Sequence, residues 1–212
     1  MDVSVVIATY GEQSWADLAA SRALPSLEGQ DGYEICVRHE PHGTCATSRN
    51  NAAALTSAEW LCFLDADDEL APDYLGAMER ALERQPTPDG TGVAASAGWL
   101  LLTPAVQQIR KGRPREPFFF PECSFETGNW LVIGTLIQKT LFDEIGGFRE
   151  HPHGLEDWNL WARAVRAGAR VVKVRDAVYR AHVNPRSKHH VLSRNRREYM
   201  VAYEHARQDA WG

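Results

Sequence analysis

The sequence predicts an α/β fold of the doubly wound, Rossmann-like type, in which helices cover both faces of a mixed, mostly parallel sheet. Short apolar runs alternate with segments of high helical propensity in the order βαβαβα, which is typical of this class. One run, Trp60–Leu64, is apolar throughout, as expected of a strand that is buried on both faces. Four acids follow it within five positions, at the strand end where open α/β sheets bind their ligands.

The first half of the chain predicts three strands and three helices. The strands are β-branched or apolar runs that end in loop sequences, and the segments between them are Ala-rich or amphipathic. Pro72 falls near the first turn of the third helix, where proline is tolerated. We expect strands at 3–9, 33–39 and 60–64, and one or two further strands within 93–103. We expect helices near 15–26 and at 71–85, and a helix that ends near Ala54.

The second half of the chain is less regular. The segment Pro104–Pro121 contains four prolines, several basic residues and three consecutive phenylalanines, so we interpret it as a mobile or partner-contacting loop. Phe118–Phe120 would either pack over the sugar site or fold onto the body as ordinary core. Beyond it we expect a short helix closed by Gly146–Gly147 and a helix near 155–167 that stops at Gly168. Strands at 169–174 and 177–183 and a helix near 190–208 complete the prediction.

Composition and length fit one folded domain. The chain has 212 residues, of which 44% are hydrophobic and 24% charged, as is usual for a soluble globular protein. Its apolar runs fall far short of the roughly 20 residues that cross a bilayer, and its start lacks the basic region of a signal peptide. We therefore expect a cytoplasmic protein with at most peripheral membrane contact. The four cysteines lack C-x-x-C spacing and are interpreted as reduced.

Charge is distributed unevenly along the chain. Residues 1–100 hold 5 basic and 16 acidic side chains, whereas residues 163–212 hold 12 basic and 4 acidic ones. The basic tail fits contact with phosphates, an anionic acceptor or a membrane surface, and equally a solvated helical face. Because the net charge of the whole chain is −5, nucleic acid is not expected as a partner.

The acids after Trp60–Leu64 form the first candidate site. Asp65, Asp67 and Asp68 give a D-x-D-D sequence at a strand end. Mg²⁺ and Mn²⁺ prefer carboxylate oxygens together with substrate phosphates. The alternative is a turn whose acids cap the helix that starts near Pro72. The buried strand that precedes the acids favours the metal site.

Glu156 and Asp157 form the second candidate site, at the start of an amphipathic helix. Acids at a helix N-terminus interact favourably with the helix dipole, which is a sufficient structural explanation. The functional alternative is a general base, because a carboxylate held rigidly at the rim of a pocket can take a proton from an acceptor hydroxyl.

His182, at the end of a predicted strand, forms the third candidate site. A single histidine is often structural. However, a basic loop follows it, and such a loop could neutralise a leaving diphosphate. The basic residues of this loop are Arg186, Lys188, His189 and His190.

These three sites, in this order, resemble those of the inverting family 2 glycosyltransferases, which have the GT-A fold. The resemblance covers about residues 3–190 and includes "VSVVIATYGE", "SRNNAAALTSAEWLCFLDADDEL", "GGFRE" and "EDWNLWARAVRAG". It implies a single GT-A domain over residues 1–212. Residues 1–100 would be its nucleotide-sugar-binding half, and residues 101–212 its acceptor-binding and catalytic half.

The resemblance also implies roles for individual residues. In such enzymes a divalent metal bridges the D-x-D acids and the diphosphate of the donor, and the aspartate of the E-D pair is the base. The second strand of the family usually ends in "DDGS"-like residues, whereas this chain reads "VRHEPHGT", in which Glu40 could substitute. By position, Thr9, Tyr10, Glu12 and Arg49 would lie at the nucleoside, Asp65 at the ribose or sugar, Asp67 and His182 at the metal, Asp157 at the acceptor proton and Glu156 at the acceptor.

The combined prediction is a metal-dependent, inverting glycosyltransferase. It would move a sugar from a nucleoside diphosphate sugar, with a UDP-sugar favoured and Mn²⁺ or Mg²⁺ as cofactor, to a hydroxyl of a glycan, lipid-linked or protein acceptor. One alternative is a sugar nucleotidyltransferase, but "TYGEQSW" after the first strand is not a Gly-rich, Lys-containing loop. The other alternative is a non-catalytic protein that binds nucleotide sugars.

Overall fold

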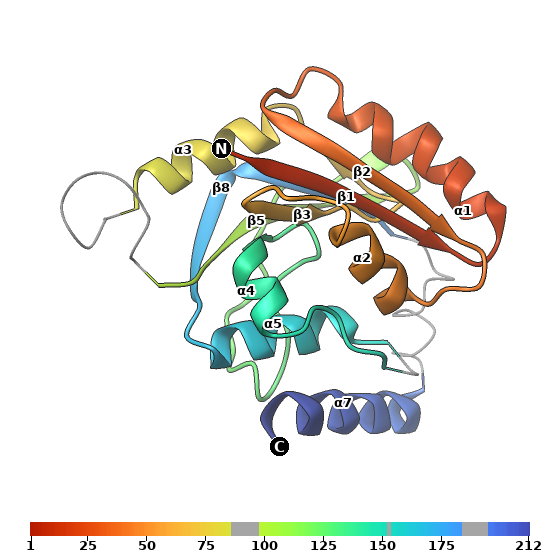
Figure 1. Ribbon diagram of the computed structural model, residues 1–212, viewed down its shortest axis with the longest axis vertical. Helices are drawn as coiled ribbons and strands as arrows, with labels where there is room; N and C mark the ends of the chain where they lie inside the picture. Colours follow the sequence, from red (N-terminus) through yellow and green to blue (C-terminus); the bar gives the residue numbers. More distant parts are fainter. Residues whose placement is uncertain (86–97, 152–153, 184–194) are drawn as a thin grey trace.

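The fold is built on one eight-stranded sheet, seen in a computed structural model that describes residues 1–85, 98–151, 154–183 and 195–212 (Figure 1). The strand order is β2-β1-β3-β7-β5-β8-β4, with β6 paired to β5. The three longest pairings, β1 with β2, β1 with β3 and β5 with β8, are parallel. The strands are β1 Val3–Tyr10, β2 Tyr33–Glu40, β3 Trp60–Phe63, β4 Glu69–Leu70, β5 Leu100–Arg110, β6 Arg113–Pro114, β7 Leu136–Gln138 and β8 Arg170–His182.

The strands predicted at 3–9, 33–39 and 60–64 are present, with β1 between β2 and β3 in a parallel arrangement. Of the segment 93–103, residues 93–97 lie outside the described residues, and β5 begins at Leu100. Every side chain of β3 is buried, as its unbroken apolar sequence requires. β2 lies at the edge of the sheet, and Ile35 and Val37 are exposed there. Because β1, β2 and β3 run parallel, their carboxyl ends meet at one edge of the sheet, which positions Thr9, Tyr10, Glu40 and Asp65 along it.

Helices cover both faces of the parallel strands, with α1 and α2 on opposite sides of β1 (Figure 1). The predicted helix near 15–26 is helical throughout but changes type along its length, from α to π to 3₁₀. The bounds are α1 Gln13–Leu18, η1 Ala19–Ala23, η2 Leu24–Leu27, α2 Cys45–Ala53, α3 Tyr74–Glu83, α4 Lys139–Glu144, α5 Glu156–Arg166 and α7 Arg196–Trp211. None of these helices in the described ranges is both long enough and apolar enough to cross a membrane.

The prediction of a loop over Pro104–Pro121 was wrong for most of its length. β5 runs through Pro104 to Arg110 and turns back through β6, and the backbone of Phe118 pairs with Val106. Proline is tolerated within this strand because the β5–β8 register shifts between Pro104 and Ala105, and strand prolines occur at such irregularities. The two late strands predicted at 169–174 and 177–183 form the single strand β8. Residues 175–177 are the irregularity across which the pairing of β8 with β5 continues.

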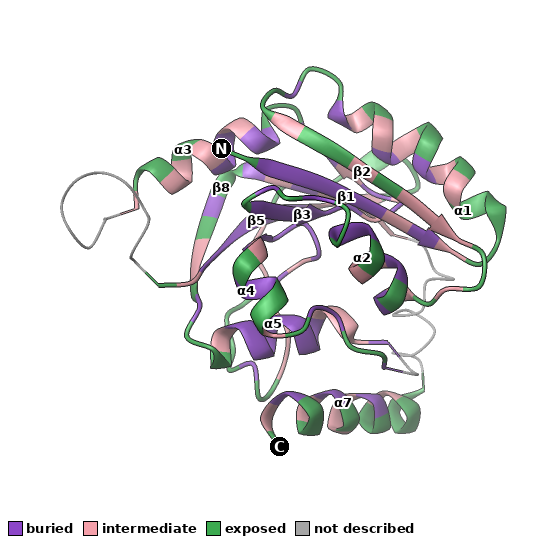
Figure 2. Ribbon diagram, viewed as in Figure 1, coloured by how far each residue is buried: buried purple, intermediate pink, exposed green. Residues whose placement is uncertain are grey.

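A second layer of helices, α5 and α7, packs beneath the sheet (Figure 2). The buried residues of α7 are Ala202, Ala206 and Ala210, which recur every four residues and form one stripe along the helix. Small side chains on this stripe allow α7 to approach α5 closely. In Figure 2 this buried stripe faces α5, and the opposite side of α7 is exposed.

A buried guanidinium fixes α5 against the loop that follows α4. Arg163 donates to Asn159 Oδ1 at 2.8 Å and to the carbonyls of Ile145 and Gly147 at 2.6 Å each. Burial lowers the pKa of Arg163 to about 10. Gly147 has a φ of 64°, and a Cβ there would lie 2.6 Å from Asn50 Oδ1, so this position requires glycine.

Loss of the Arg163 guanidinium should destabilise the fold. In Arg163→Met the stem still packs, but three acceptors in the interior lose their donor, so we expect the free energy of unfolding to fall by about 2–4 kcal/mol in urea denaturation. The control is Arg170→Met, which changes an exposed arginine and should alter stability by less than about 0.5 kcal/mol. Equal losses in the two variants would contradict a structural role for the buried guanidinium.

Candidate active site

The turn after β3 gathers three carboxylates at the carboxyl edge of the sheet. One oxygen each from Asp65, Asp67 and Asp68 lies within 4.8 Å of the others. The turn is closed by the backbone N–H of Asp68, which donates to the carbonyl of Asp65 at 3.1 Å. The π-helical segment after α1 supports the same turn, because Arg22 donates to the carbonyl of Asp67 at 2.9 Å.

Asp68 attaches this turn to β8. Its two carboxylate oxygens accept hydrogen bonds from the Tyr179 hydroxyl at 2.9 Å and from the backbone N–H of His182 at 2.8 Å. Tyr179 OH also accepts from the backbone N–H of Asp65 at 3.4 Å. Burial, together with the charges of Asp65 and Asp67, raises the pKa of Asp68 well above its usual range. Asp68 is therefore a structural member of the cluster whose oxygens are already used.

Arg49 neutralises part of the cluster from α2. Its Nη2 lies 2.6 Å from Asp65 Oδ1, and its guanidinium stands over the Phe148 ring at 5.0 Å. The helix that carries Arg49 begins with a capping box, in which the side chains of Thr44 and Thr47 each bond the backbone of the other. Arg49 and Asp65 thus form a direct ion pair, which the sequence did not predict.

Asp67 is the member of the cluster whose carboxylate remains available. Within the described ranges of the chain, no other side chain bonds or pairs with it. Burial, and secondarily the charge of Asp65, raises its pKa to about 6. Three carboxylates crowded in this way, with their repulsion only partly offset by Arg49 and Arg22, fit a hard divalent cation such as Mg²⁺ or Mn²⁺.

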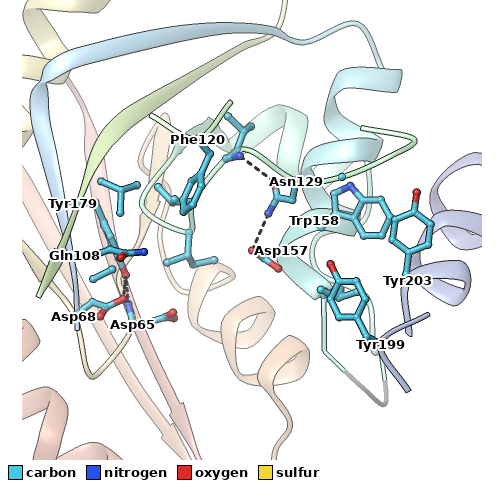
Figure 3. A pocket seen from close by; sticks show the side chains of 17 residues that line it. Asp65, Asp68, Gln108, Phe120, Asn129, Asp157, Trp158, Tyr179, Tyr199 and Tyr203 are labelled. Carbon is cyan, nitrogen blue, oxygen red and sulfur yellow. Dashed lines mark hydrogen bonds between the residues drawn. The ribbon is translucent and has the colours of Figure 1, made fainter. Parts of the chain in front are cut away.

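A cavity of about 440 Å³ extends from the acidic turn to the start of α5 (Figure 3). Asp65 and Asp68 line one end of it, and Asp157 lies across from them. Asp157 Oδ2 accepts a hydrogen bond from Asn129 Nδ2 at 3.1 Å. The volume falls within the range of pockets that bind small molecules. Asp65 and Asp68 of the first predicted site therefore face Asp157 of the second across a single cavity, and Asp67 is not among the residues that line it.

The backbone before α5 holds Asp157 in position. Leu155 has a φ of 73°, a left-handed conformation that side chains with a Cβ adopt at an energetic cost, and it follows Gly154 at 94°. Burial, and secondarily the charge of Glu156, raises the pKa of Asp157. A raised pKa makes a carboxylate a stronger base.

Glu156 faces a different hollow from Asp157. A depression of about 240 Å³ is lined by Glu156 together with Tyr10, the N-terminal residues of α2 and Arg149. Cys45 lies beside Glu156, and burial raises the pKa of its thiol. The two adjacent acids at the start of α5 thus lie on different walls of the site.

The residues predicted to surround the nucleoside lie at the ends of β1 and β2, outside the 440 Å³ cavity. Thr9 is buried and its hydroxyl lies 2.9 Å from His39 Nδ1. Glu12 is exposed just before α1 and accepts from Ser14 at 3.3 Å. Glu40 accepts from Asn51 at 2.8 Å and from Arg38 at 2.5 Å, and these bonds hold its pKa below the usual range.

The ring of His182 lies beside Glu69, with 3.5 Å between Nε2 and Oε1, and is not part of the three-carboxylate cluster. Among the hydrogen bonds of the described residues, His182 contacts the acidic turn only through its backbone N–H, which donates to Asp68. The basic loop predicted just beyond, with Arg186, Lys188, His189 and His190, lies outside the described residues.

A family model described as glycosyl transferase family 2 matches residues 21–135 of the chain. The chain belongs to glycosyl transferase family 2. This confirms the predicted family and enzyme class. The matched segment of this family 2 glycosyltransferase includes the acidic turn and ends before Asp157. Comparison with curated protein sequences gave no match.

Solved structures confirm the GT-A fold of this family 2 glycosyltransferase. S. aureus TarS aligns with a TM-score of 0.64 at 18% identity over 87% of this chain and 37% of TarS. TarS 1–349 in complex with UDP-GlcNAc gives 0.63 at 17% identity over 87% of this chain and 59% of that one. The complex of TarS 1–349 with UDP gives a TM-score of 0.62 at 17% identity, over 99% of this chain and 70% of that one. The chain thus spans 60% or less of the first TarS chains it matches.

Several residues of this candidate site were not predicted from the sequence. Tyr179 and Arg22 hold the acidic turn, and Asn129 holds Asp157. Tyr199 and Tyr203 reach the cavity from α7. No local pattern distinguishes these residues from ordinary core or surface positions, because each acts through a partner at least 28 positions away or through a pocket formed by several elements.

Removing the charge of Asp67 should stabilise the metal-free protein at neutral pH. A carboxyl whose pKa is higher in the folded chain than in the unfolded chain costs stability once it ionises, so the cost is absent below about pH 4 and complete above about pH 6. In chelator, Asp67→Asn should raise Tm by about 2–4 °C at pH 7.5. The gain should disappear near pH 4.

The control for this experiment is Asp73→Asn. Asp73 is exposed, and its hydrogen bond from Arg80 lowers its pKa, so its ionised form is stabilising and the substitution should lower Tm slightly at pH 7.5. A fall in Tm for Asp67→Asn at neutral pH would contradict repulsion within the acidic turn.

Proposed function

We propose that this family 2 glycosyltransferase moves a sugar from a nucleoside diphosphate sugar to an acceptor hydroxyl with inversion, in a reaction that depends on Mn²⁺ or Mg²⁺. The observation that carries the proposal is the single cavity lined at one end by the acidic turn and at the other by Asp157. A UDP-sugar is the favoured donor, since TarS, a fold neighbour, has been solved with UDP-GlcNAc and with UDP.

The donor is assigned to the half formed by residues 1–100. We assign Asp67 to the metal, Asp65 to the ribose or sugar, and Arg49 to the positioning of Asp65. A divalent ion at this turn would offset the negative charge that develops on the departing diphosphate. Thr9, Tyr10, Glu12 and Glu40 remain the proposed nucleoside residues, and His182 a proposed further metal ligand, from the carboxyl ends of β1, β2 and β8.

Catalysis is assigned to Asp157, in the half formed by residues 101–212. The acceptor O–H would give its proton to Asp157 while its oxygen attacks the anomeric carbon, and the bond to the nucleoside diphosphate breaks on the opposite side. Asn129 donates to Oδ2, which orients the carboxylate. Glu156, on the neighbouring wall, is proposed to orient the acceptor.

Two other functions were considered for the same fold. A sugar nucleotidyltransferase would require a phosphate-binding loop after β1, and "YGEQSW" supplies neither the glycines nor the lysine. A non-catalytic nucleotide-sugar-binding protein would have no need of a carboxylate across the cavity from the acidic turn. Release of free nucleoside diphosphate from a donor in the presence of Mn²⁺ separates catalysis from simple binding.

The cellular location of the enzyme and its acceptor are also proposed here. We place it in the cytoplasm, where nucleotide sugars are available to an enzyme that has at most peripheral membrane contact. A glycan, lipid-linked or protein acceptor would reach the cavity from the side of α7. Separation of the chain into soluble and membrane fractions on expression would test this placement.

Asp157→Asn should abolish transfer while leaving donor binding intact. The amide keeps the shape of the side chain but cannot accept the acceptor proton, so kcat should fall about 10²–10⁴-fold. Because burial raises the pKa of Asp157, its ionised form does not stabilise the fold, so the substitution should not lower Tm at neutral pH. Glu156→Gln is the control, with a milder loss of rate. Normal transfer by Asp157→Asn would show that Asp157 is not the base.

Asp67→Ala should abolish metal-dependent donor binding without loss of the fold. The turn keeps the bonds of Asp68 and Arg49, so the melting curve should remain cooperative while Mn²⁺ no longer strengthens the binding of a UDP-sugar in calorimetry. Asp73→Ala, at an exposed acid outside the cavity, should behave as wild type. Donor affinity in Mn²⁺ that is the same in Asp67→Ala and wild type would contradict the metal assignment.

A further inference from the structure

The end of the cavity beyond Asp157 is aromatic. Tyr199 and Tyr203 reach it from α7 and Trp158 from α5, whereas Phe120 lines the cavity on the other side of Asp157, toward Tyr179 (Figure 3). The two tyrosines are four residues apart on α7, so their side chains project from the same face of the helix. Both lie beyond residues 21–135, the segment that the family model matches.

Contacts within the protein hold two side chains of this wall, Trp158 and Tyr203, in place. The rings of Trp158 and Tyr203 stack with centroids 4.7 Å apart and an interplanar angle of 25°. The Tyr203 hydroxyl donates to the carbonyl of Glu126 at 2.6 Å, and Trp158 Nε1 donates to the carbonyl of Phe125 at 2.9 Å. A ligand that packs here does not have to order these side chains, which favours binding.

The polar groups of the cavity are amides, hydroxyls and carboxylates. Gln108 and Asn129 line it alongside the tyrosines, and its acids are Asp65, Asp68 and Asp157. Among the described residues that line it there is no lysine or arginine. At the end beyond Asp157, a phosphate or carboxylate would therefore meet the Asp157 carboxylate, with no cation among the described lining residues to offset it. A bare acyl chain would leave the amides and carboxylates desolvated without partners.

We propose that this end of the cavity is the acceptor subsite, and that the acceptor group which enters it is an uncharged sugar ring. A pyranose presents a C–H face that packs against an aromatic ring and hydroxyl edges that bond amides and carboxylates, which matches the wall of Tyr199 and Tyr203 with Asn129 and Asp157 near it (Figure 3). The ring would place one hydroxyl at Asp157. This inference rests on the proposed glycosyl transfer and specifies its acceptor.

Sugar binding to the full chain, measured without turnover, tests the proposal. Lactose, cellobiose and maltose serve as neutral probes, glucuronic acid and glucose 6-phosphate as anionic probes, and saturation-transfer NMR titrations give the Kd. We expect at least one neutral disaccharide to bind, and to bind more tightly than both anionic probes. Tyr199→Ala should weaken that binding about tenfold, because the apolar contact is lost. Tyr199→Phe, which keeps the ring, should stay within about twofold.

Met200→Ala is the matched control, since Met200 is the next residue of α7 and is exposed. It should bind the disaccharide as wild type does. Failure of every neutral disaccharide to bind, tighter binding of either anionic probe, or equal affinity in Tyr199→Ala and wild type would each overturn the proposal. So would binding of octyl glucoside that depends on its alkyl chain.

Release of nucleoside diphosphate from the donor is followed in parallel without acceptor. Donor hydrolysis with no sugar binding would overturn the acceptor subsite alone. Sugar binding with no donor hydrolysis would support the subsite and contradict the proposed function.

Discussion

The buried guanidinium of Arg49 is the charge on which the arrangement of the site depends. Burial alone would lower its pKa, but Cys45, Asp65 and Glu156 around it raise the pKa above its ordinary value. Its charge also lowers the pKa of Asp157, in opposition to burial. Taking a cation out of water costs several kcal/mol unless acids surround it. One residue of α2 therefore links the acids after β3 to those at the start of α5.

Contacts distant in sequence hold the two ends of the cavity at a fixed separation. Asp68 joins the acidic turn to β8 through Tyr179 and the backbone of His182. Asn50 of α2 exchanges two hydrogen bonds of 2.8 Å with the backbone of Phe148, in the loop that leads to α5. Both elements are thus tied to the parallel core. A reaction that requires a donor and a base at a defined distance benefits from such preorganisation.

The helix α7 extends the site beyond the matched part of the chain. Its alanine stripe brings it close to α5, and Asn159 of α5 donates to the carbonyl of Ala206 at 3.0 Å and to Asp209 at 2.9 Å. Because α7 is fixed on α5, its tyrosines are fixed relative to Asp157. The aromatic end of the cavity is therefore a consequence of how two helices pack, and no property of α7 alone implies it.

The sequence by itself determined the strands of the parallel half, the helices that connect them, the acidic turn and the acids at the start of α5, because apolar periodicity, capping and strand-end chemistry are local. It misassigned β5, since Pro104 in a strand is acceptable only at a register shift that β8 creates. Only the tertiary structure decided that Asp157 faces the acidic turn while Glu156 faces Tyr10. It also decided that the carboxylate of Asp68 accepts a hydrogen bond from Tyr179. These outcomes depend on contacts between segments far apart in the chain, which no local pattern encodes.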